Sequence, residues 1–318
     1  MVSAALKLEP ELEPQPLELT VEMPASCRIE IALREVSVAY PCGREGVKTV
    51  LSGINLQIAQ GEFVAILGET GCGKSTMLRL ILGQEFPTSG AVEVDSKPVT
   101  KIDARCGYVP QKYSLFPDRT VLGNVIYGPE NAKSGLPGRL RPSFWRFRKQ
   151  LRAEAAAYLQ RMGLRAQDLN KYPHQLSGGM QQRVAIAQAL LMKPPVLLMD
   201  EAFSALDPST RSSLQEQLHI IWRESRPTIV FVTHNTQEAL LLGTRLILLG
   251  RHQEEQAQQS NVLLDLEIPT ARLPFARRAH SAEFQDLHEY VKQIAYKSSS
   301  MNREEDAAQP LTSEGNLQ

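Results

Sequence analysis

The sequence has little that would draw the chain to a charged partner or into a membrane. Its 318 residues contain 35 basic and 35 acidic side chains, so the bulk attraction to nucleic acid or to an acidic bilayer is missing. The most apolar stretch, residues 239–250, carries Arg245 and is shorter than the roughly 18 residues needed to cross a bilayer. We therefore expect no nucleic-acid partner, and contact with a membrane only through other proteins.

Cysteine is also scarce, and a signal peptide is not indicated. The four cysteines are too few for a disulfide scaffold and none form a CxxC pair, which fits a reduced, cytosolic compartment. Residues 1–27 are rich in Glu and Pro and lack a basic start followed by an apolar run, so they predict a disordered leader. Hydrophobic residues make up 42% of the chain, enough to bury the core of one large domain or of two.

Two kinds of strand pattern open the ordered part of the chain. Apolar and polar residues alternate over residues 29–40 and again over 54–58, which predicts an antiparallel β layer. Residues 63–67 (FVAIL) are continuously apolar, as expected for a strand covered on both faces. A parallel central sheet is therefore predicted beside the antiparallel layer.

Helical patterns dominate the middle of the chain. Strand signals vanish over residues 119–183, and residues 144–162 have apolar positions at helical spacing, which predicts a helical insert. Apolar strands return at 196–199 and 228–232 with a helical pattern at 209–223 between them, as in a doubly wound sheet.

A glycine-rich loop follows the first buried strand. The segment GETGCGKST fits G-x-x-x-x-G-K-[ST] between a strand and a helix, which is the context that a phosphate-binding loop requires. Its backbone N–H groups would surround phosphate oxygens, Lys74 would neutralise the terminal phosphates, and Ser75 would offer its hydroxyl to Mg²⁺. The alternative is a plain glycine-rich turn. The predicted loop comprises Gly68, Glu69, Thr70, Gly71, Cys72, Gly73, Lys74, Ser75 and Thr76.

Cys72 lies inside this loop, where the helix N-terminus and Lys74 would favour a thiolate. We therefore predict a cysteine that reacts with thiol reagents and is protected by bound nucleotide. The alternative is a buried, inert thiol.

Two carboxylates end the strand at 196–199. Asp200 stands where a parallel strand delivers its side chain to the ligand edge of a sheet, suited to holding Mg²⁺ through water. Glu201 follows directly and could polarise an attacking water. The alternative is that the pair only marks a helix N-terminus.

The segment LSGGMQQR opens another helix. Ser177, Gly178 and Gly179 present a hydroxyl and bare N–H groups beyond the helix end, which is either an ordinary N-cap or a second anion site. Because the chain already has one phosphate loop, a second such site indicates two copies that share nucleotides.

These motifs together resemble the ATPase subunit of ATP-binding-cassette (ABC) transporters over residues 28–250. Six elements occur in the family's order: GETGCGKST, the glutamine of YVPQ, LSGGMQQR, VLLMDE, SALD and a histidine after the last strand. The resemblance implies an α/β fold: a P-loop NTPase core of mostly parallel sheet flanked by helices, an antiparallel β subdomain and a helical subdomain. It also implies ATP and Mg²⁺ as cofactors, with Ser75, Gln111 and Asp200 near the metal.

The resemblance assigns roles to softer sites as well. It implies that adenine stacks on Tyr40, that Gln111 reports Mg²⁺ occupancy to the helical insert, and that Asp207 contacts the opposite subunit. His234 would contact the γ-phosphate and act with Glu201 and Lys74 in catalysis. Each has a plainer alternative: a hairpin end for Tyr40, a solvated loop position for Gln111 and a satisfied core histidine for His234.

Within the family, the sequence is most similar to the nitrate, sulfonate and taurine importer group, which takes up small anions. Ala202 replaces the Pro usual after the catalytic Glu, and Asn235 replaces the Asp usual after the histidine. Neither change removes a phosphate-binding group. Residues 251–318 are expected to be a C-terminal extension beyond a core that ends near Gly250, polar and disordered from about residue 301.

One basic and aromatic segment has no assigned role. Residues 139–152 interleave six Arg or Lys side chains with Phe144, Trp145 and Phe147. They predict either a solvated helix face or a contact with a permease loop or lipid headgroups.

The function that these observations favour is ATP hydrolysis powering an importer for a small anion. The chain would act as a homodimer on the cytoplasmic face of the inner membrane, under an integral-membrane permease served by a solute-binding protein. The alternatives are the ATPase of an exporter, and a soluble cassette ATPase acting on nucleic acid or ribosomes. The latter usually has long coiled coils or tandem cassettes, which this sequence lacks.

Overall fold

The computed structural model describes residues 28–42, 46–112, 114–133, 142–252 and 260–308, and contains a six-stranded central sheet. Its order is β10-β9-β3-β8-β7-β6, and every neighbouring pair is parallel except β10 with β9. The strands are β3 (Phe63–Gly68), β6 (Cys106–Val109), β7 (Val196–Asp200), β8 (Thr228–Thr233), β9 (Arg245–Leu249) and β10 (Val262–Glu267). The continuously apolar strands β3, β7 and β8 lie in its interior, fully buried, so the predicted parallel sheet is confirmed.

A second sheet of four antiparallel strands covers one face of the molecule. It has the order β2-β1-β4-β5, with β1 (Ile29–Cys42), β2 (Gly46–Ala59), β4 (Ser89–Val94) and β5 (Lys97–Pro98). Leu33 lies opposite Leu56 in this sheet, and both belong to a core shared with Ile66 of β3 and Met77 of α1 (Lys74–Leu82). The period-two pattern thus places one apolar face against the central sheet, as predicted.

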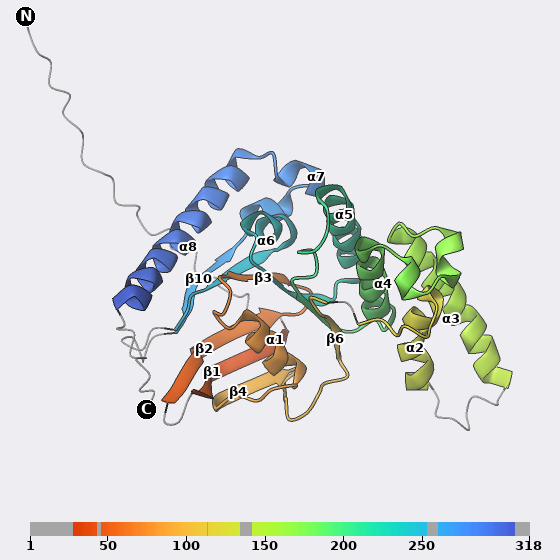
Figure 1. The fold of residues 1–318 in the computed structure, drawn as a ribbon, viewed down its shortest axis with the longest axis horizontal. Coiled ribbons are helices and arrows are strands. Elements are labelled where there is room, and N and C mark those ends of the chain that lie inside the picture. Colours follow the sequence, from red (N-terminus) through yellow and green to blue (C-terminus); the bar gives the residue numbers. More distant parts are fainter. Residues whose placement is uncertain (1–27, 43–45, 113, 134–141, 253–259, 309–318) are drawn as a thin grey trace, which may run out of the picture.

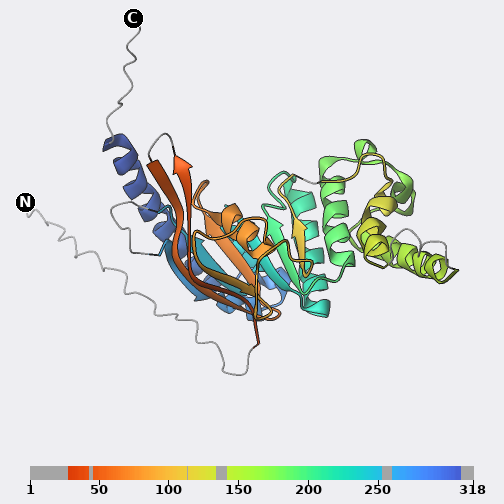
Figure 2. The same cartoon turned by 90° about the horizontal axis from the view of Figure 1, so that it is seen from below.

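Helices form a projecting subdomain and cover the other face of the central sheet. The subdomain contains α2 (Val121–Lys133), α3 (Pro142–Arg161) and α4 (Gly178–Leu191), with 3-10 turns at Ala166–Asn170 and Pro173–Gln175. The others are α5 (Pro208–Ser225), α6 (Thr236–Leu242), a 3-10 turn at Pro269–Arg272, α7 (Phe275–Arg278) and α8 (Ala282–Ala308). Figures 1 and 2 both show α2 and α3 at one end of the molecule and α8 at the other. Of the helices in the described ranges, none is long and apolar enough to span a membrane.

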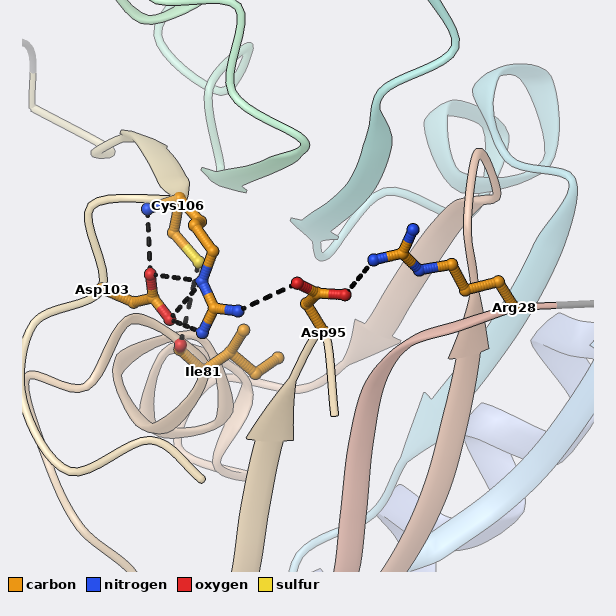
Figure 3. A network of polar contacts seen from close by, with 6 residues as sticks. Arg28, Ile81, Asp95, Asp103 and Cys106 are labelled. Atoms are coloured by element: carbon orange, nitrogen blue, oxygen red, sulfur yellow. Dashed lines mark hydrogen bonds and ion pairs between the residues drawn. The ribbon is translucent and has the colours of Figure 1, made fainter. Parts of the chain in front are cut away.

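An ionic network joins the two sheets close to β6 (Figure 3). Arg105 donates from Nε to both carboxylate oxygens of Asp103, at 2.9 and 3.1 Å, and its Nη1 lies 3.5 Å from Asp95 Oδ2. Asp95, in the turn between β4 and β5, also pairs with Arg28 at the start of β1. The network therefore ties the antiparallel sheet to the entry of β6.

The central sheet continues beyond Gly250, so the expected end of the core there is wrong. Strand β10 pairs with β9, and its Asp265 accepts two hydrogen bonds of 2.7 Å from the buried guanidinium of Arg245. This ion pair compensates a charge buried in the sheet, so β10 helps to hold β9 in place. Residues 301–308 continue α8 and residues 309–318 lie outside the described residues, so disorder from about residue 301 stays a prediction. The expected leader, residues 1–27, lies outside the described residues.

Part of the basic and aromatic segment forms the start of α3. Phe144 is buried, whereas Trp145 is 57% exposed and lies beneath the Arg148 guanidinium. Arg148 is itself paired with Glu130 of α2 at 2.6 Å. Residues 139–141 of the basic and aromatic segment lie outside the described residues. The segment stays open to both interpretations, a solvated helix face and a contact with a permease loop or lipid headgroups.

Candidate active site

The phosphate loop joins β3 to α1 and is closed from within by its lysine. Gly71 and Gly73 have φ values of +86° and +101°, and a Cβ on Gly73 would lie 2.6 Å from Leu51 Cδ2, so this turn requires glycine. Lys74 Nζ donates to the carbonyl oxygens of Gly68 at 2.8 Å and Glu69 at 2.6 Å. The ammonium group is therefore fixed across the loop beside the α1 N-terminus, an arrangement that attracts phosphate.

The two carboxylates of the β7 end face this loop. Asp200 Oδ1 accepts a hydrogen bond from Ser75 Oγ at 3.1 Å. Burial raises the pKa of the Asp200 carboxyl, and the neighbouring Glu201 charge adds to the shift. Glu201 has a φ of +44°, a left-handed conformation that is costly for a non-glycine residue. This turn directs the two adjacent side chains to different partners.

Glu201 is held from both sides. Its Oε2 accepts a hydrogen bond from Gln111 Nε2 at 2.9 Å, and its Oε1 lies 3.2 Å from His234 Nδ1. Gln111 follows β6 and His234 follows β8, the two strands that flank β7. Parallel strands end at a common edge of the sheet. Gln111, 90 positions before Glu201, and His234, 33 positions after it, therefore meet Glu201 there.

A pocket of about 430 Å³ lies between the loop and Glu201. Its lining residues are Val50, Thr70, Gly71, Gly73, Lys74, Ser75, Thr76, Arg79, Gln111 and Glu201. Arg79 was not singled out in the sequence, although it lies five residues after Lys74 on α1. Arg79 is paired with Glu85 at 2.8 Å and is the second cation, after Lys74, in the lining of this pocket. Two cations suit the pocket to a polyanion.

Tyr40 does not line this pocket. Its hydroxyl donates to Glu85 Oε2 at 2.6 Å, and its ring packs partly buried against the core between the sheets. Adenine stacking on Tyr40 stays a prediction.

The second predicted anion site lies apart from this pocket. Ser177 caps α4, with its Oγ accepting from Met180 N at 3.4 Å, and is exposed. Asp207 caps α5: its Oδ1 accepts hydrogen bonds from Ser209 Oγ at 2.6 Å and from Thr210 N at 3.0 Å, and these bonds lower the pKa of its carboxyl. A Cβ on Gly179 would lie 3.1 Å from Thr210 Cγ2, so the starts of α4 and α5 are neighbours. This helix end, formed by Ser177, Gly178 and Gly179, does not line the pocket of its own chain.

The prediction of a reactive Cys72 is wrong for this structure. The side chain is 1% exposed and packs into the core beneath the loop, and a Cβ on Gly68 would lie 2.6 Å from its Sγ. Burial raises the pKa of the thiol, outweighing the lowering effect of Lys74. Cys72 therefore contributes its backbone, not its thiol, to the loop.

We expect native-state labelling to avoid Cys72. In a Cys27→Ser background, maleimide should modify the exposed Cys42 first and the half-buried Cys106 more slowly, since burial raises the pKa of its thiol to about 12. The buried Cys72 should react only after unfolding. Mass spectrometry of peptides after timed labelling measures this. Fast labelling of Cys72 that MgATP prevents would contradict the packing described above.

Comparisons with known proteins agree with this geometry. Residues 51–204 match the family described as ABC transporter. An uncharacterised ABC transporter ATP-binding protein of Methanocaldococcus jannaschii is 43% identical over 250 residues, covering 77% of this chain and 86% of the relative. An aliphatic sulfonates import ATP-binding protein of Burkholderia lata is 41% identical, covering 78% and 68%. A bicarbonate transport ATP-binding protein of Synechococcus elongatus is 38% identical, and the match spans only 34% of its length.

Solved structures lead to the same family. A dimeric ATP-binding cassette bound to ADP and Pi in a post-hydrolysis state has a TM-score of 0.61 and 33% identity, covering 75% of this chain and 98% of that one. The chain belongs to the ATP-binding proteins of ABC transporters, so the P-loop NTPase fold predicted from the sequence is confirmed. It binds and hydrolyses ATP.

Proposed function

We propose that this chain is the ATP-hydrolysing subunit of a membrane importer for a small anionic solute of the nitrate, sulfonate or taurine kind. The observation that carries the proposal is Glu201, held between Gln111 and His234 at the edge where Lys74 closes the phosphate loop. The similarity to sulfonate and bicarbonate transport proteins supports the import of an anion.

The residues around Asp200 fit Mg²⁺. Ser75 Oγ and Asp200 Oδ1 are hard oxygen donors 3.1 Å apart, and the raised pKa of the buried Asp200 carboxyl means that a nearby cation would be favourable. Mg²⁺ is usually held by one or two protein oxygens together with substrate phosphates and water. Ser75 and Asp200 would hold the ion, with Gln111 at the same edge. Bound there, Mg²⁺ would neutralise charge on the transferred phosphoryl group.

The chain's own groups account for the remaining chemistry. Lys74 binds the terminal phosphates, and Glu201 orients the attacking water and accepts its proton. His234 is 57% exposed, so its ring can reach the γ-phosphate while Nδ1 steadies Glu201 at 3.2 Å. Catalysis is then positioning and charge neutralisation, with no covalent intermediate.

The second half of each ATP site comes from a second copy. The helix end at Ser177 is exposed and does not line the pocket of its own phosphate loop, so it is free to cover the ATP held by the other copy. The dimeric cassette structure supports this assembly. Binding of ATP would close the dimer and hydrolysis would reopen it.

A groove between β6 and the helical subdomain is suited to a permease loop. It encloses about 570 Å³, and its lining includes Tyr108 and Pro110 of the β6 end, Gly128 of α2, and Ala189 and Met192 at the α4 end. Met192 is exposed, which suits an adaptable apolar contact. Pro110 directly precedes Gln111, so an occupant would act on the residue that holds Glu201. The chain would thus lie on the cytoplasmic face of the membrane.

Transport measurements test the proposal. In a strain lacking this chain, the wild type should restore ATP-dependent uptake of labelled nitrate, bicarbonate or an alkanesulfonate, and Lys74→Ala should not. Restored efflux of a preloaded solute would instead favour an exporter. Normal transport of every solute in the deletion strain would contradict a transport role.

A further inference from the structure

We infer that Arg278 in the C-terminal extension is a positioning residue that fixes His234 through helix α6. The inference rests on the role proposed above for His234 and adds a residue 44 positions further along the chain. It assigns a function in hydrolysis to an extension that lies outside the matched family segment, residues 51–204.

Arg278 is a buried cation held by backbone carbonyls. It is 1% exposed, and its Nε, Nη1 and Nη2 donate to Leu273 O at 3.2 Å, Leu241 O at 2.8 Å and Ala271 O at 2.6 Å. Burial lowers the pKa of the guanidinium to about 10, so it remains charged at neutral pH. Among the described residues no carboxylate pairs with it. A buried charge is costly, and this one is compensated only where these three carbonyls are held in place.

One of these carbonyls belongs to the last turn of α6. That helix has seven residues, Thr236–Leu242, too few to be stable alone in water. A guanidinium on its final carbonyls satisfies an orphan acceptor and opposes the negative end of the helix dipole. Arg278 also binds the turn at Ala271 and Leu273, so it joins the C-terminal end of α6 to the extension.

The other end of α6 leads directly to His234. Asn235 caps the helix by accepting from Gln237 N at 2.9 Å and Glu238 N at 3.2 Å, and Thr233 Oγ1 donates to Glu238 Oε2 at 2.8 Å. His234 therefore lies between the last residue of β8 and the N-cap of α6. Both ends of α6 are bound. If the hydrogen bond from Arg278 to Leu241 is lost, α6 can tilt, and the tilt displaces the backbone of His234.

Close packing gives this helix little room. A Cβ on Gly243, the residue after α6, would lie 2.8 Å from Ala239 O and 3.2 Å from Ala65 Cβ of β3. On the other side of Arg278, the Phe275 ring lies 5.9 Å from the guanidinium and stacks on His219 of α5 at 4.8 Å. Burial lowers the pKa of His219 to about 4, so this ring adds no second charge at neutral pH. The cluster thus anchors the guanidinium rigidly above α6.

A second part of the extension, in helix α8, also lies beside His234. Tyr296 and Ser298 of α8 line a cavity of about 720 Å³ together with His234, Thr236 and the start of the phosphate loop. Helix α8 therefore passes from the side of α6 to the vicinity of the histidine, as the position of α8 beside α6 in Figure 1 illustrates. Arg278 of α7 thus binds the end of α6, and Tyr296 and Ser298 of α8 lie beside His234.

A double-mutant cycle in the full chain tests the inference with MgATP as substrate. Arg278→Met should lower kcat about tenfold with an unchanged KM for ATP, because it misplaces a catalytic side chain without touching the phosphate loop. In a His234→Ala background the same substitution should cause no further loss, since its effect passes through the histidine. Arg278→Lys should recover part of the activity. The matched control is Arg277→Met at the adjacent, exposed arginine, which should leave kcat unchanged.

The outcomes separate this inference from the function on which it rests. Equal losses from Arg278→Met with and without His234 would mean a purely structural role and would overturn the inference. Full activity of His234→Ala alone would instead contradict the proposed role of His234. If Arg278→Met does not fold, as judged by thermal unfolding, Arg278→Lys takes its place in the cycle. In nitrogen-labelled NMR spectra of Arg278→Lys, the ring chemical shifts of His234 should then differ from those of wild type, and identical shifts would overturn the inference.

Discussion

Replacing Glu201 by Gln should lower ATP hydrolysis at least about a hundredfold while leaving ATP binding intact, because it removes the base that accepts the proton of the attacking water. Gln has the same shape and can still hydrogen-bond to Gln111 and His234, which hold Glu201 at 2.9 and 3.2 Å. Steady-state phosphate release gives the rate, and the fluorescence of a labelled ATP analogue gives the affinity.

Glu216→Gln provides the control for this substitution. Glu216 is exposed on α5 and outside the site, so the same change of charge there should leave the rate unaltered. If Glu201→Gln hydrolysed ATP at the wild-type rate, the assignment of Glu201 as the catalytic base would be contradicted. Loss of ATP binding would show that the carboxylate serves the fold of the pocket instead.

Ser177→Arg should reduce hydrolysis to about one hundredth of the wild-type rate or less, since a bulky cation would occupy the place of the nucleotide held by the other copy. Ser177 is exposed and does not line the pocket around Lys74, so the affinity of the monomer for ATP should not change. Loss of its 3.4 Å capping bond should cost only about 1 kcal/mol of stability.

Two comparisons make this result decisive. Ser143→Arg, at an exposed serine on α3, should hydrolyse ATP normally. The affinity of Lys74→Ala for ATP shows how weak binding becomes when the phosphate loop itself is damaged. If Ser177→Arg bound ATP as weakly as Lys74→Ala does, the serine would be acting within its own chain and the shared site would be refuted.

The interior of the fold was predicted well from the sequence because buried parallel strands are recognisable from short, continuous apolar runs. The continuous apolar run before Gly68 and the glycines after it define β3, the phosphate loop and α1 without distant information. The edge strand β10 was missed for the opposite reason. Its residues are mostly half-exposed, and its place is set by the pairing of Asp265 with Arg245 across the sheet.

Side-chain direction was the main quantity that local patterns could not supply. The position of Cys72 in the loop was predicted correctly, but the side of the loop on which its thiol lies depends on packing against a core built from both sheets. Arg79 carries only the signal of its spacing from Lys74. The three-way arrangement of Gln111, Glu201 and His234 depends on strand order, which residue patterns within each segment do not reveal.

The central claim is that each ATP is held by two copies of this chain, and the mass of Glu201→Gln in solution tests it most directly. Sedimentation equilibrium should give the mass of one chain without nucleotide and of two chains with ATP, because bound ATP is not hydrolysed and the closed state persists. The combined variant Glu201→Gln, Ser177→Arg should remain a single chain with ATP bound. A Glu201→Gln protein that stays a single chain when saturated with ATP would contradict the account.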